Sequence, residues 1–337
     1  MHMESLLQEA QEVYKNNFPL RASFERAVFF SWGCTIGDCQ FCYMSTQPEH
    51  KKPTETRRSY ASIFAEVLLC KHLHWDFGFF TGGIGAFTPD EIEFMLKIIY
   101  EILDEKIWLS IGPVARPLLQ RYQPYIKGVV GSTETINPEL HAQVCPSKPL
   151  APYERMFEHA KKLGLQRAMT FIVGLGETRE DLFLLKNFIQ TYGISKIHIY
   201  GLIPVEGTVY RDAAIPSAEE QAWWIAQLRI YFPALDIQAG MWEDRVERVS
   251  LLLSAGANSL SKYPALRTFG KPQSYLFKKE VEKSGRVFTS NLLHLPNVNW
   301  GKEVDVLEID KHLKEEIKQK LLQYIKVMSK SKLMLLS

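Results

Sequence analysis

The chain has 337 residues, 46% of them hydrophobic, with 40 lysines and arginines against 38 aspartates and glutamates. That length and apolar content suffice for one barrel-sized domain or two smaller ones, and the near-neutral charge gives no support to a nucleic-acid or anionic-membrane partner. No apolar run is long enough to span a bilayer, and the polar N-terminal residues lack the core of a signal peptide.

Short apolar runs alternate with longer amphipathic stretches along the chain. The apolar runs predict eight strands, at 27–33, 76–82, 107–112, 128–134, 167–174, 196–203, 235–241 and 257–261. The stretches between them predict helices, including 60–74, 90–104, 153–163, 179–192, 218–232 and 243–254. Strands that are apolar nearly throughout are typical of a parallel sheet covered on both faces.

Eight βα units in succession predict an α/β fold, a (β/α)8 TIM-type barrel, with a doubly wound open sheet as the alternative. Polar and glycine-rich groups recur where the predicted strands end, which is where active sites of such barrels gather. We expect an N-terminal helical extension at 1–26, the barrel at 27–269 and an α-rich C-terminal segment at 270–337.

Three cysteines, Cys34, Cys39 and Cys42, follow the first predicted strand on one short loop. Three thiolates so placed can ligate three irons of a four-iron cluster and leave the fourth iron open. The alternatives are small buried residues, a disulfide with one free thiol, or part of a zinc site, although no fourth Cys or His follows at a suitable distance. An odd total of five cysteines, three of them clustered, favours a reducing cytoplasm.

The spacing Cys34-x4-Cys39-x2-Cys42, with Phe41 before the last cysteine, resembles the cluster loop of radical S-adenosylmethionine (SAM) enzymes. The usual family spacing is three residues and then two, so the first gap is longer here by one. The resemblance implies a 4Fe-4S cluster held by the three cysteines and SAM bound to the open iron. It also implies an enzyme that cleaves SAM reductively to a 5′-deoxyadenosyl radical, which abstracts hydrogen from a substrate.

Further motifs, in the order of the family, imply which residues contact SAM. Thr81, Gly82 and Gly83 resemble the motif that meets the SAM amino group. Glu134, with Ser132, matches a strand-four carboxylate that bonds the ribose, and Arg155 resembles the arginine that pairs with the SAM carboxylate. The remaining implied cofactor contacts are Phe41 and Tyr43 in the cluster loop, Ile172 and Gly174 on strand five, and Tyr200 and Leu202 on strand six.

Each of these residues also has an ordinary structural interpretation. Arg155 could form a surface salt bridge with Glu154 or Glu158, Glu134 could be a satisfied polar group at a strand end, and Phe41 could be core packing. Only Cys70 and Cys145 remain as further thiols, which disfavours a second, sulfur-donating cluster.

The strand-four motif and the lengthened cysteine spacing resemble a subgroup with biotin synthase and hydrogenase maturases, and within it the radical SAM maturase of the mono-iron hydrogenase. That branch is usually described with a first gap of five residues, one more than here. It implies a role in making the iron–guanylylpyridinol cofactor, a small-molecule substrate in the barrel cavity, and a reductant such as ferredoxin or flavodoxin. The alternatives are a sulfurtransferase of biotin or lipoyl synthase type and a non-enzymatic iron–sulfur protein.

Overall fold

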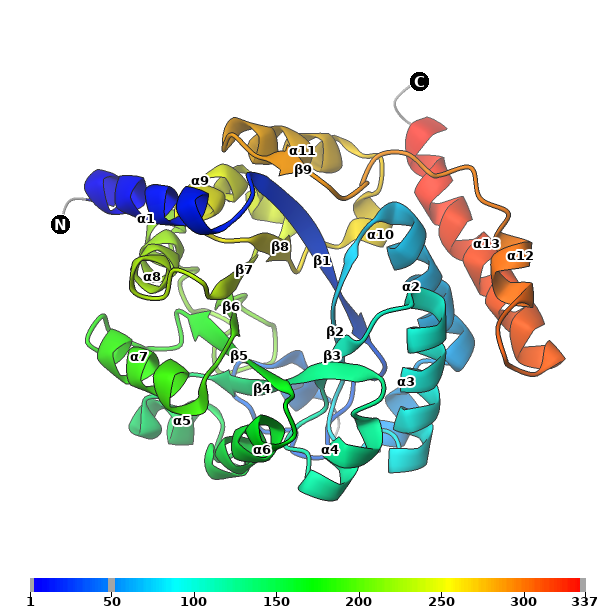
Figure 1. Cartoon of the computed structure of the whole chain (residues 1–337), viewed down its shortest axis with the longest axis horizontal. Coiled ribbons are helices and arrows are strands. Elements are labelled where there is room, and N and C mark those ends of the chain that lie inside the picture. The colour runs from blue at the N-terminus through cyan, green and yellow to red at the C-terminus, as the bar shows by residue number, and fades with distance from the viewer. Residues whose placement is uncertain (1–2, 48–51, 334–337) are drawn as a thin grey trace.

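The computed structural model describes residues 3–47 and 52–333. Eight parallel strands form a closed barrel, because β1 pairs with β2 on one side and with β8 on the other (Figure 1). The strands are β1 Arg21–Phe29, β2 Asp76–Thr81, β3 Ile107–Ser110, β4 Ile126–Glu134, β5 Gln166–Val173, β6 Lys196–Gly201, β7 Asp236–Gly240 and β8 Ser259–Ser261. The predicted TIM-type barrel is confirmed, and the open doubly wound sheet is not what the chain forms.

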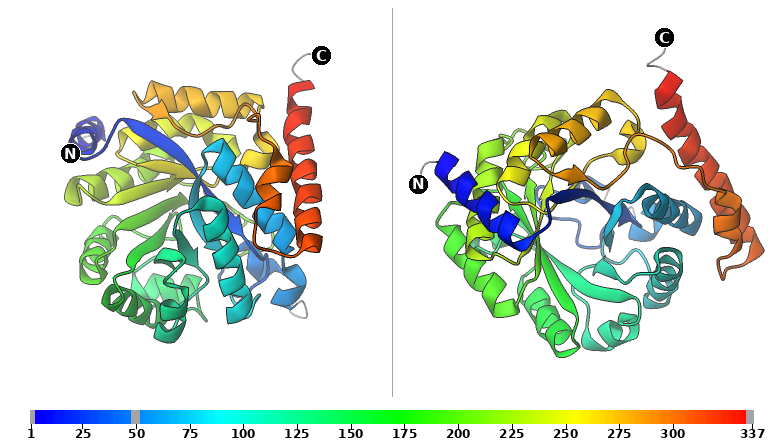
Figure 2. Two further views of the ribbon diagram at one scale, coloured as in Figure 1. Left: turned by 45° about the vertical axis from the view of Figure 1, so that its right-hand side comes forward. Right: turned by 45° about the horizontal axis from the view of Figure 1, so that its top comes forward.

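Helices surround the barrel, as both views in Figure 2 show. They are α2 Tyr60–Leu73, α3 Pro89–Leu103, α4 Arg116–Tyr122, α5 Pro138–Val144, α6 Ala151–Lys162, α7 Asp181–Tyr192, α8 Ala218–Tyr231 and α9 Val249–Ser254, with 3-10 turns η1 Tyr43–Thr46, η2 Pro53–Thr56 and η3 Glu243–Arg248. Helix α3 illustrates how the sequence fixes a boundary, since Thr88 and Glu91 form a capping box ahead of the first turn. No helix in the described part of the chain is long and apolar enough to cross a membrane.

The first strand was predicted at 27–33, but β1 spans Arg21–Phe29. The predicted boundary at residue 26 therefore falls inside a barrel strand, in which Phe24 is fully buried. The shift has a physical cause: the first half of β1 points Glu25 into the barrel, so its sequence does not read as an apolar run. Residues after Phe29 leave the barrel and begin the cysteine loop.

The segments outside the barrel pack against it at both ends of the chain. Helix α1, Met3–Asn17, lies against α8, and the short strand β9, Val287–Phe288, extends the sheet by pairing with β1. The long helix α13, Lys311–Leu333, lies along α2, where the hydroxyls of Tyr324 and Ser62 are 2.8 Å apart. The other helices of this C-terminal part are α10 Ala265–Thr268, α11 Pro272–Lys283 and α12 Trp300–Asp305. The three-part division stays a prediction, and residues 1–2 and 334–337 of it lie outside the described residues.

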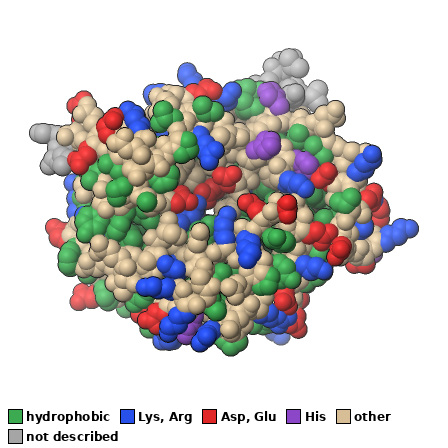
Figure 3. Space-filling view, viewed as in Figure 1, with side chains coloured by type: hydrophobic (Ala, Val, Ile, Leu, Met, Phe, Trp, Pro, Cys, Tyr) green, Lys and Arg blue, Asp and Glu red, His purple; other side chains and the backbone are tan. Residues whose placement is uncertain are grey.

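A buried polar network fills the barrel near the amino ends of its strands. Lys196 Nζ donates to Glu25 Oε1 at 2.6 Å, and Gln238 Nε2 donates to Glu25 Oε2 at 2.7 Å. His198 Nδ1 lies 2.9 Å from Gln238 Oε1, so the side-chain oxygen of Gln238 accepts from it. Figure 3 shows the molecule from the side of the amino ends of the strands, and charged side chains gather near the middle of that face. The network closes this end of the barrel and leaves the other end for the cavity.

The buried imidazole of His198 makes stability depend on pH. Burial, and then the charge of Lys196, lower the pKa of His198 to about 4 from the ordinary 6.5. As pH falls below about 6.5, the imidazole of His198 is protonated in the unfolded chain but stays neutral in the folded protein. We expect the free energy of unfolding to fall by up to about 3 kcal/mol between pH 6.5 and 4 from this group alone.

Chemical denaturation of the wild type and of His198→Gln across that pH range measures the contribution. The wild-type curve is expected to fall more steeply with decreasing pH than the curve of the variant. Parallel curves would show that His198 contributes nothing to the pH dependence.

Candidate functional site

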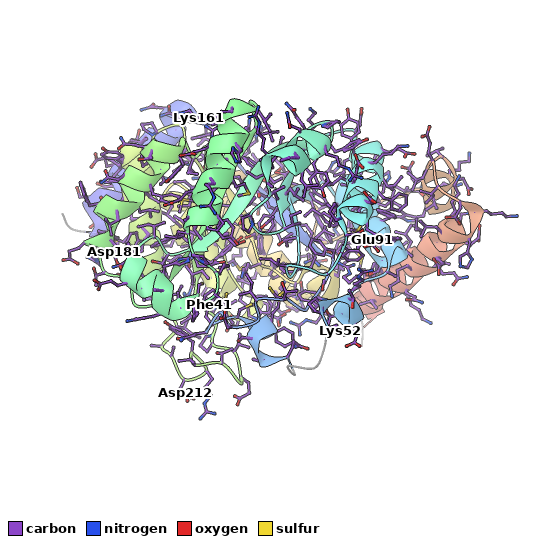
Figure 4. The ribbon with its side chains drawn as sticks, turned by 90° about the horizontal axis from the view of Figure 1, so that it is seen from below. Phe41, Lys52, Glu91, Lys161, Asp181 and Asp212 are labelled. Carbon is purple, nitrogen blue, oxygen red and sulfur yellow. The ribbon has the colours of Figure 1, made fainter. Side chains whose placement is uncertain are left out.

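A cavity of about 1150 Å³ lies at the carboxyl ends of the barrel strands. Side chains from β1 to β6 and β8 line it together with the cysteine loop that joins β1 to α2. In Figure 4, Phe41 of this loop lies on the lower side of the molecule, whereas Lys161, near the end of α6, lies at the opposite edge. The site therefore occupies the end of the barrel at which the strands finish.

The cysteine loop is fixed to the barrel through its backbone. The amide of Thr35 donates to Ile84 O at 2.9 Å, and the amide of Gln40 donates to Val144 O at 2.9 Å. A Cβ atom on Gly83 would stand 1.7 Å from Gly33 O and 2.8 Å from the Cα of Cys34, so only glycine allows this approach. The loop is thus held between the end of β2 and the end of α5.

Cys34, Cys39 and Cys42 are all half-buried, and all three line the cavity. Burial raises the pKa of the Cys42 thiol, and the amide of Met44, which donates to Cys42 Sγ at 3.4 Å, opposes this. The neighbouring thiol of Cys145 lowers the pKa of Cys39. The three candidate ligands therefore share one space, on a loop that is already folded.

The three thiols fit a four-iron cluster. Within residues 3–47 and 52–333, no three metal-binding side chains converge as a single ion would require. In a cluster, however, each thiolate binds a different iron, so the sulfurs must face a common space rather than meet at a point. The hydroxyl of Tyr153, which lines the same cavity, is buried and has no hydrogen-bond partner among the described residues, which leaves a polar group for a ligand.

Glu134 ends β4 in a strained conformation, with φ of 61° after an irregularity in the β4–β5 pairing. Its carboxylate accepts from Lys148 Nζ at 3.1 Å and from Thr170 Oγ1 at 3.0 Å. Burial would lower the pKa of Lys148, but the charges of Glu134, Cys39, Cys145 and Tyr153 together raise it well above its ordinary value. Lys148 and Glu134 thus form a buried ion pair on the wall of the cavity.

Most of the residues predicted to contact SAM do line this cavity: Phe41, Tyr43, Thr81, Gly82, Gly83, Ser132, Glu134, Ile172, Tyr200 and Leu202. They come from β2, β4, β5 and β6 or the segments that follow them, and from the cysteine loop. The sequence order of the motifs thus corresponds to neighbouring positions around one end of the barrel. Their individual contacts with SAM stay predictions.

Two predicted residues lie elsewhere. Arg155 is exposed on α6, whose buried face carries Tyr153, Met156 and Phe157, and it does not line the cavity. Arg155 lies off the face that α6 turns to the barrel, and its expected pairing with the SAM carboxylate stays a prediction. Gly174 does not line the cavity either; its amide donates to Glu177 Oε1 at 2.7 Å in the turn after β5.

Sequence reasoning missed the two lysines of the site, Lys148 and Lys262, which both line the cavity. Lys148 follows α5 between two prolines of the loop, and Lys262 follows β8 directly. A lysine in a loop ordinarily lies in solvent, so the sequence carries no signal for Lys148. For Lys262 the signal was its position at the end of a predicted barrel strand.

Residues 28–189 match the Radical SAM superfamily. An uncharacterised protein of Methanocaldococcus jannaschii is 32% identical over 94% of this chain and 88% of its own length. Biotin synthase of Legionella pneumophila is 26% identical over 83% of this chain and 91% of its own length.

Among solved structures, methylornithine synthase (PylB) superimposes with a TM-score of 0.72, at 19% identity over 85% of this chain and 89% of its own. The FeFe-hydrogenase maturase HydG from Carboxydothermus hydrogenoformans gives a TM-score of 0.67, at 15% identity over 99% and 86%. At such identities these two structures show a shared fold. Together with the family match and the sequence relatives, they identify the chain: it belongs to the radical SAM superfamily of enzymes, which use a 4Fe-4S cluster and SAM.

Proposed function

We propose that the chain abstracts hydrogen from a small molecule held in the barrel cavity, as a step in the biosynthesis of the iron–guanylylpyridinol cofactor of the mono-iron hydrogenase. The observation that carries the general part is the cavity of about 1150 Å³, which three thiols and the Glu134 carboxylate face together. Such a volume is somewhat above the ordinary range for a site that holds one small molecule, about 300–1,000 Å³, which suits SAM and a substrate side by side. A reductant such as ferredoxin or flavodoxin would supply the electron, in a reducing cytoplasm.

In this proposal Cys34, Cys39 and Cys42 hold the cluster at the mouth of the barrel. With cluster and SAM both bound, reductive cleavage of the sulfonium bond supplies a 5′-deoxyadenosyl radical. The protein orients SAM and excludes water: Glu134 accepts hydrogen bonds from the ribose hydroxyls, and Gly82 and Gly83 present backbone to the amino group. Lys148 donates to the carboxylate of Glu134 and holds it in place.

The alternative, sulfur insertion, needs a second cluster with its own ligands. The two further thiols, Cys70 and Cys145, are fully buried, and neither lines the cavity. The cavity wall carries hydroxyls instead, from Ser110 on β3 and Thr170 on β5. These positions favour a single-cluster enzyme over a sulfurtransferase of biotin or lipoyl synthase type.

The assignment to the mono-iron hydrogenase pathway rests on the sequence resemblance of the cysteine loop and of the strand-four motif. The cavity supports it in one respect, since aromatic side chains such as Tyr200 and Trp242 line it beside hydroxyl groups. Such walls suit a polar aromatic ring of the size of a pyridinol.

Anaerobic reconstitution tests the proposal. Iron and sulfide are counted per chain, and 5′-deoxyadenosine and methionine are assayed after addition of dithionite and SAM. One four-iron cluster with SAM cleavage is the expected result, and pyridinol precursors labelled with deuterium are then expected to pass the label to 5′-deoxyadenosine. A second cluster would favour sulfur insertion, and a full cluster without any cleavage would favour the non-enzymatic iron–sulfur protein.

Glu134→Gln is expected to weaken SAM binding while leaving the cluster intact. The amide keeps the shape of the side chain but removes the charge that accepts hydrogen bonds from the ribose. A hydrogen bond to a charged group contributes about 1.5–3 kcal/mol, which corresponds to a rise in Kd of at least about tenfold. Titration with SAM measures the affinity, and iron analysis checks the cluster.

The matched control is Glu139→Gln, an exposed glutamate in the first turn of α5. Its Kd for SAM is expected to equal that of the wild type. Equal affinity of Glu134→Gln and the wild type would remove Glu134 from the SAM site.

A further inference from the structure

Lys262 stands at the carboxyl end of β8, directly after Ser261. Its backbone is in the left-handed region, with φ of 61°, a conformation that non-glycine residues seldom adopt. Protein surrounds the residue, yet its side chain is open to the cavity that it lines. Strained backbone of this kind clusters at active sites and ligand-binding sites.

The other cations that line the cavity already have carboxylate partners. Arg26 is paired with Glu66, Arg57 with Glu91, Lys148 with Glu134, and Arg267 with Glu243. Lys262 has no ion pair and no hydrogen bond within the described part of the chain. Among the cations of the described residues that line the cavity, Lys262 is therefore the one whose charge is available to a ligand.

The ammonium group of Lys262 lies over the aromatic ring of Tyr200. Lys262 Nζ lies 4.5 Å from the centroid of that ring, and Gly240 on the next strand leaves room for it, because a Cβ there would stand 2.2 Å from Tyr200 Cδ1. The attraction of the tyrosine ring for the cation offsets only part of the cost of drawing the ammonium away from bulk water. Burial accordingly lowers the pKa of Lys262, with Glu134 acting against it.

We propose that Lys262 binds a carboxylate group of the substrate, so that the substrate is a monocarboxylic acid with an apolar or aromatic body. This inference deepens the proposed function and rests on it for the presence of SAM in the same cavity. An ammonium and a carboxylate form a charge-assisted hydrogen bond that an enclosed site strengthens. The ring of Tyr200 and the neighbouring side chains of Trp242 and Leu266 would contact the body of the molecule.

The charges favour a carboxylate over a phosphate. One unpaired ammonium matches a single negative charge, whereas a phosphate monoester carries about 1.5–2 charges at neutral pH and ordinarily recruits several cations. The carboxylate of SAM is the other source of the same chemistry. Lys262 follows β8, whereas the predicted contacts of SAM come from the cysteine loop and from β2, β4, β5 and β6, among them Tyr200, whose ring Lys262 contacts. We assign Lys262 to the substrate, and the SAM affinity of its variants tests that assignment.

The test uses a matched pair of probes, 4-iodobenzoate and the uncharged 4-iodobenzamide. Both are titrated calorimetrically into anaerobically reconstituted protein saturated with SAM. The wild type is expected to bind the benzoate at least about tenfold more tightly than the benzamide. That ratio is expected to fall to near one in Lys262→Met, with Lys262→Gln as the substitute if the methionine variant does not fold, and to persist in Lys262→Arg. Arg267→Met, which removes an already paired cation of the same wall, is the control and is expected to keep the wild-type ratio.

A wild-type ratio near one, no binding of the benzoate, or a ratio that survives Lys262→Met would overturn the proposal. A tenfold loss of SAM affinity in Lys262→Met would assign the residue to the carboxylate of SAM and also overturn it. SAM cleavage is assayed in the same preparations. A protein that keeps the benzoate preference but never cleaves SAM would contradict the proposed function while supporting the anion site.

Discussion

Cys39→Ala is expected to lose the iron–sulfur cluster and all SAM cleavage. Cys39 is one of three thiols that face the cavity, and its removal leaves two of the proposed ligands. With two ligands left, a four-iron cluster has two unprotected irons and is lost to solvent and chelators. Iron and sulfide analysis and the yield of 5′-deoxyadenosine measure the effect, which we expect to be a fall to background in each.

Cys70→Ala is the matched control for this experiment. Cys70 is a fully buried thiol in α2 that does not line the cavity, and burial raises the pKa of its thiol far above the ordinary value. Its replacement is expected to leave iron content and SAM cleavage at wild-type levels. An iron-replete, active Cys39→Ala protein would refute the assignment of the cluster ligands.

Gly83→Ala is expected to prevent cluster loading without dismantling the barrel. The added methyl group would stand 1.7 Å from Gly33 O and 2.4 Å from Gly33 C, and both are backbone atoms that no rotamer change can move. The loop must move where Gly33 and Cys34 meet Gly83, which carries Cys34 away from the other two thiols. Overpacking of this kind ordinarily costs about 1–3 kcal/mol of stability, so we expect a folded protein with little bound iron.

Iron analysis after reconstitution and thermal unfolding together measure this effect. The control is Gly301→Ala in α12, where the nearest atom to the new methyl group is Asn299 Oδ1 at 3.4 Å. That variant is expected to bind iron as the wild type does. Normal iron content in Gly83→Ala would show that the loop does not depend on this contact.

The parts of the molecule that local pattern controls could be predicted from the sequence. Barrel strands buried on both faces read as apolar runs, and the thiols of the cysteine loop are close in sequence, so both were found. The first half of β1 was missed because Glu25 points inward, where Lys196 neutralises it from a strand far along the chain. Local pattern does not reveal a partner 171 residues away.

The parts of the site that the sequence did not reveal have the same origin. Arg155 matches a family position but is exposed on α6, whose buried face carries Tyr153, Met156 and Phe157, and its contact with SAM stays a prediction. Lys148 reaches the cavity because its loop folds back over the barrel, where His141 Nε2 lies 2.7 Å from Lys148 O. Which lysine is buried beside which carboxylate depends on the tertiary fold, and one sequence does not contain that information locally.

The closure of the barrel bears on when the protein becomes functional during its synthesis. β1, made first, completes its pairing only with Ser259–Ser261 of β8 and Val287–Phe288 of β9. The cysteine loop follows the end of β1, and its backbone amides donate hydrogen bonds to the carbonyl groups of Ile84 and Val144. A ribosome that has released the first 100 residues has therefore exposed three reactive thiols with no finished frame around them. The frame around the three thiols is complete only after β8 and β9 have been made, and the unfinished nascent chain is the stage most open to thiol oxidation.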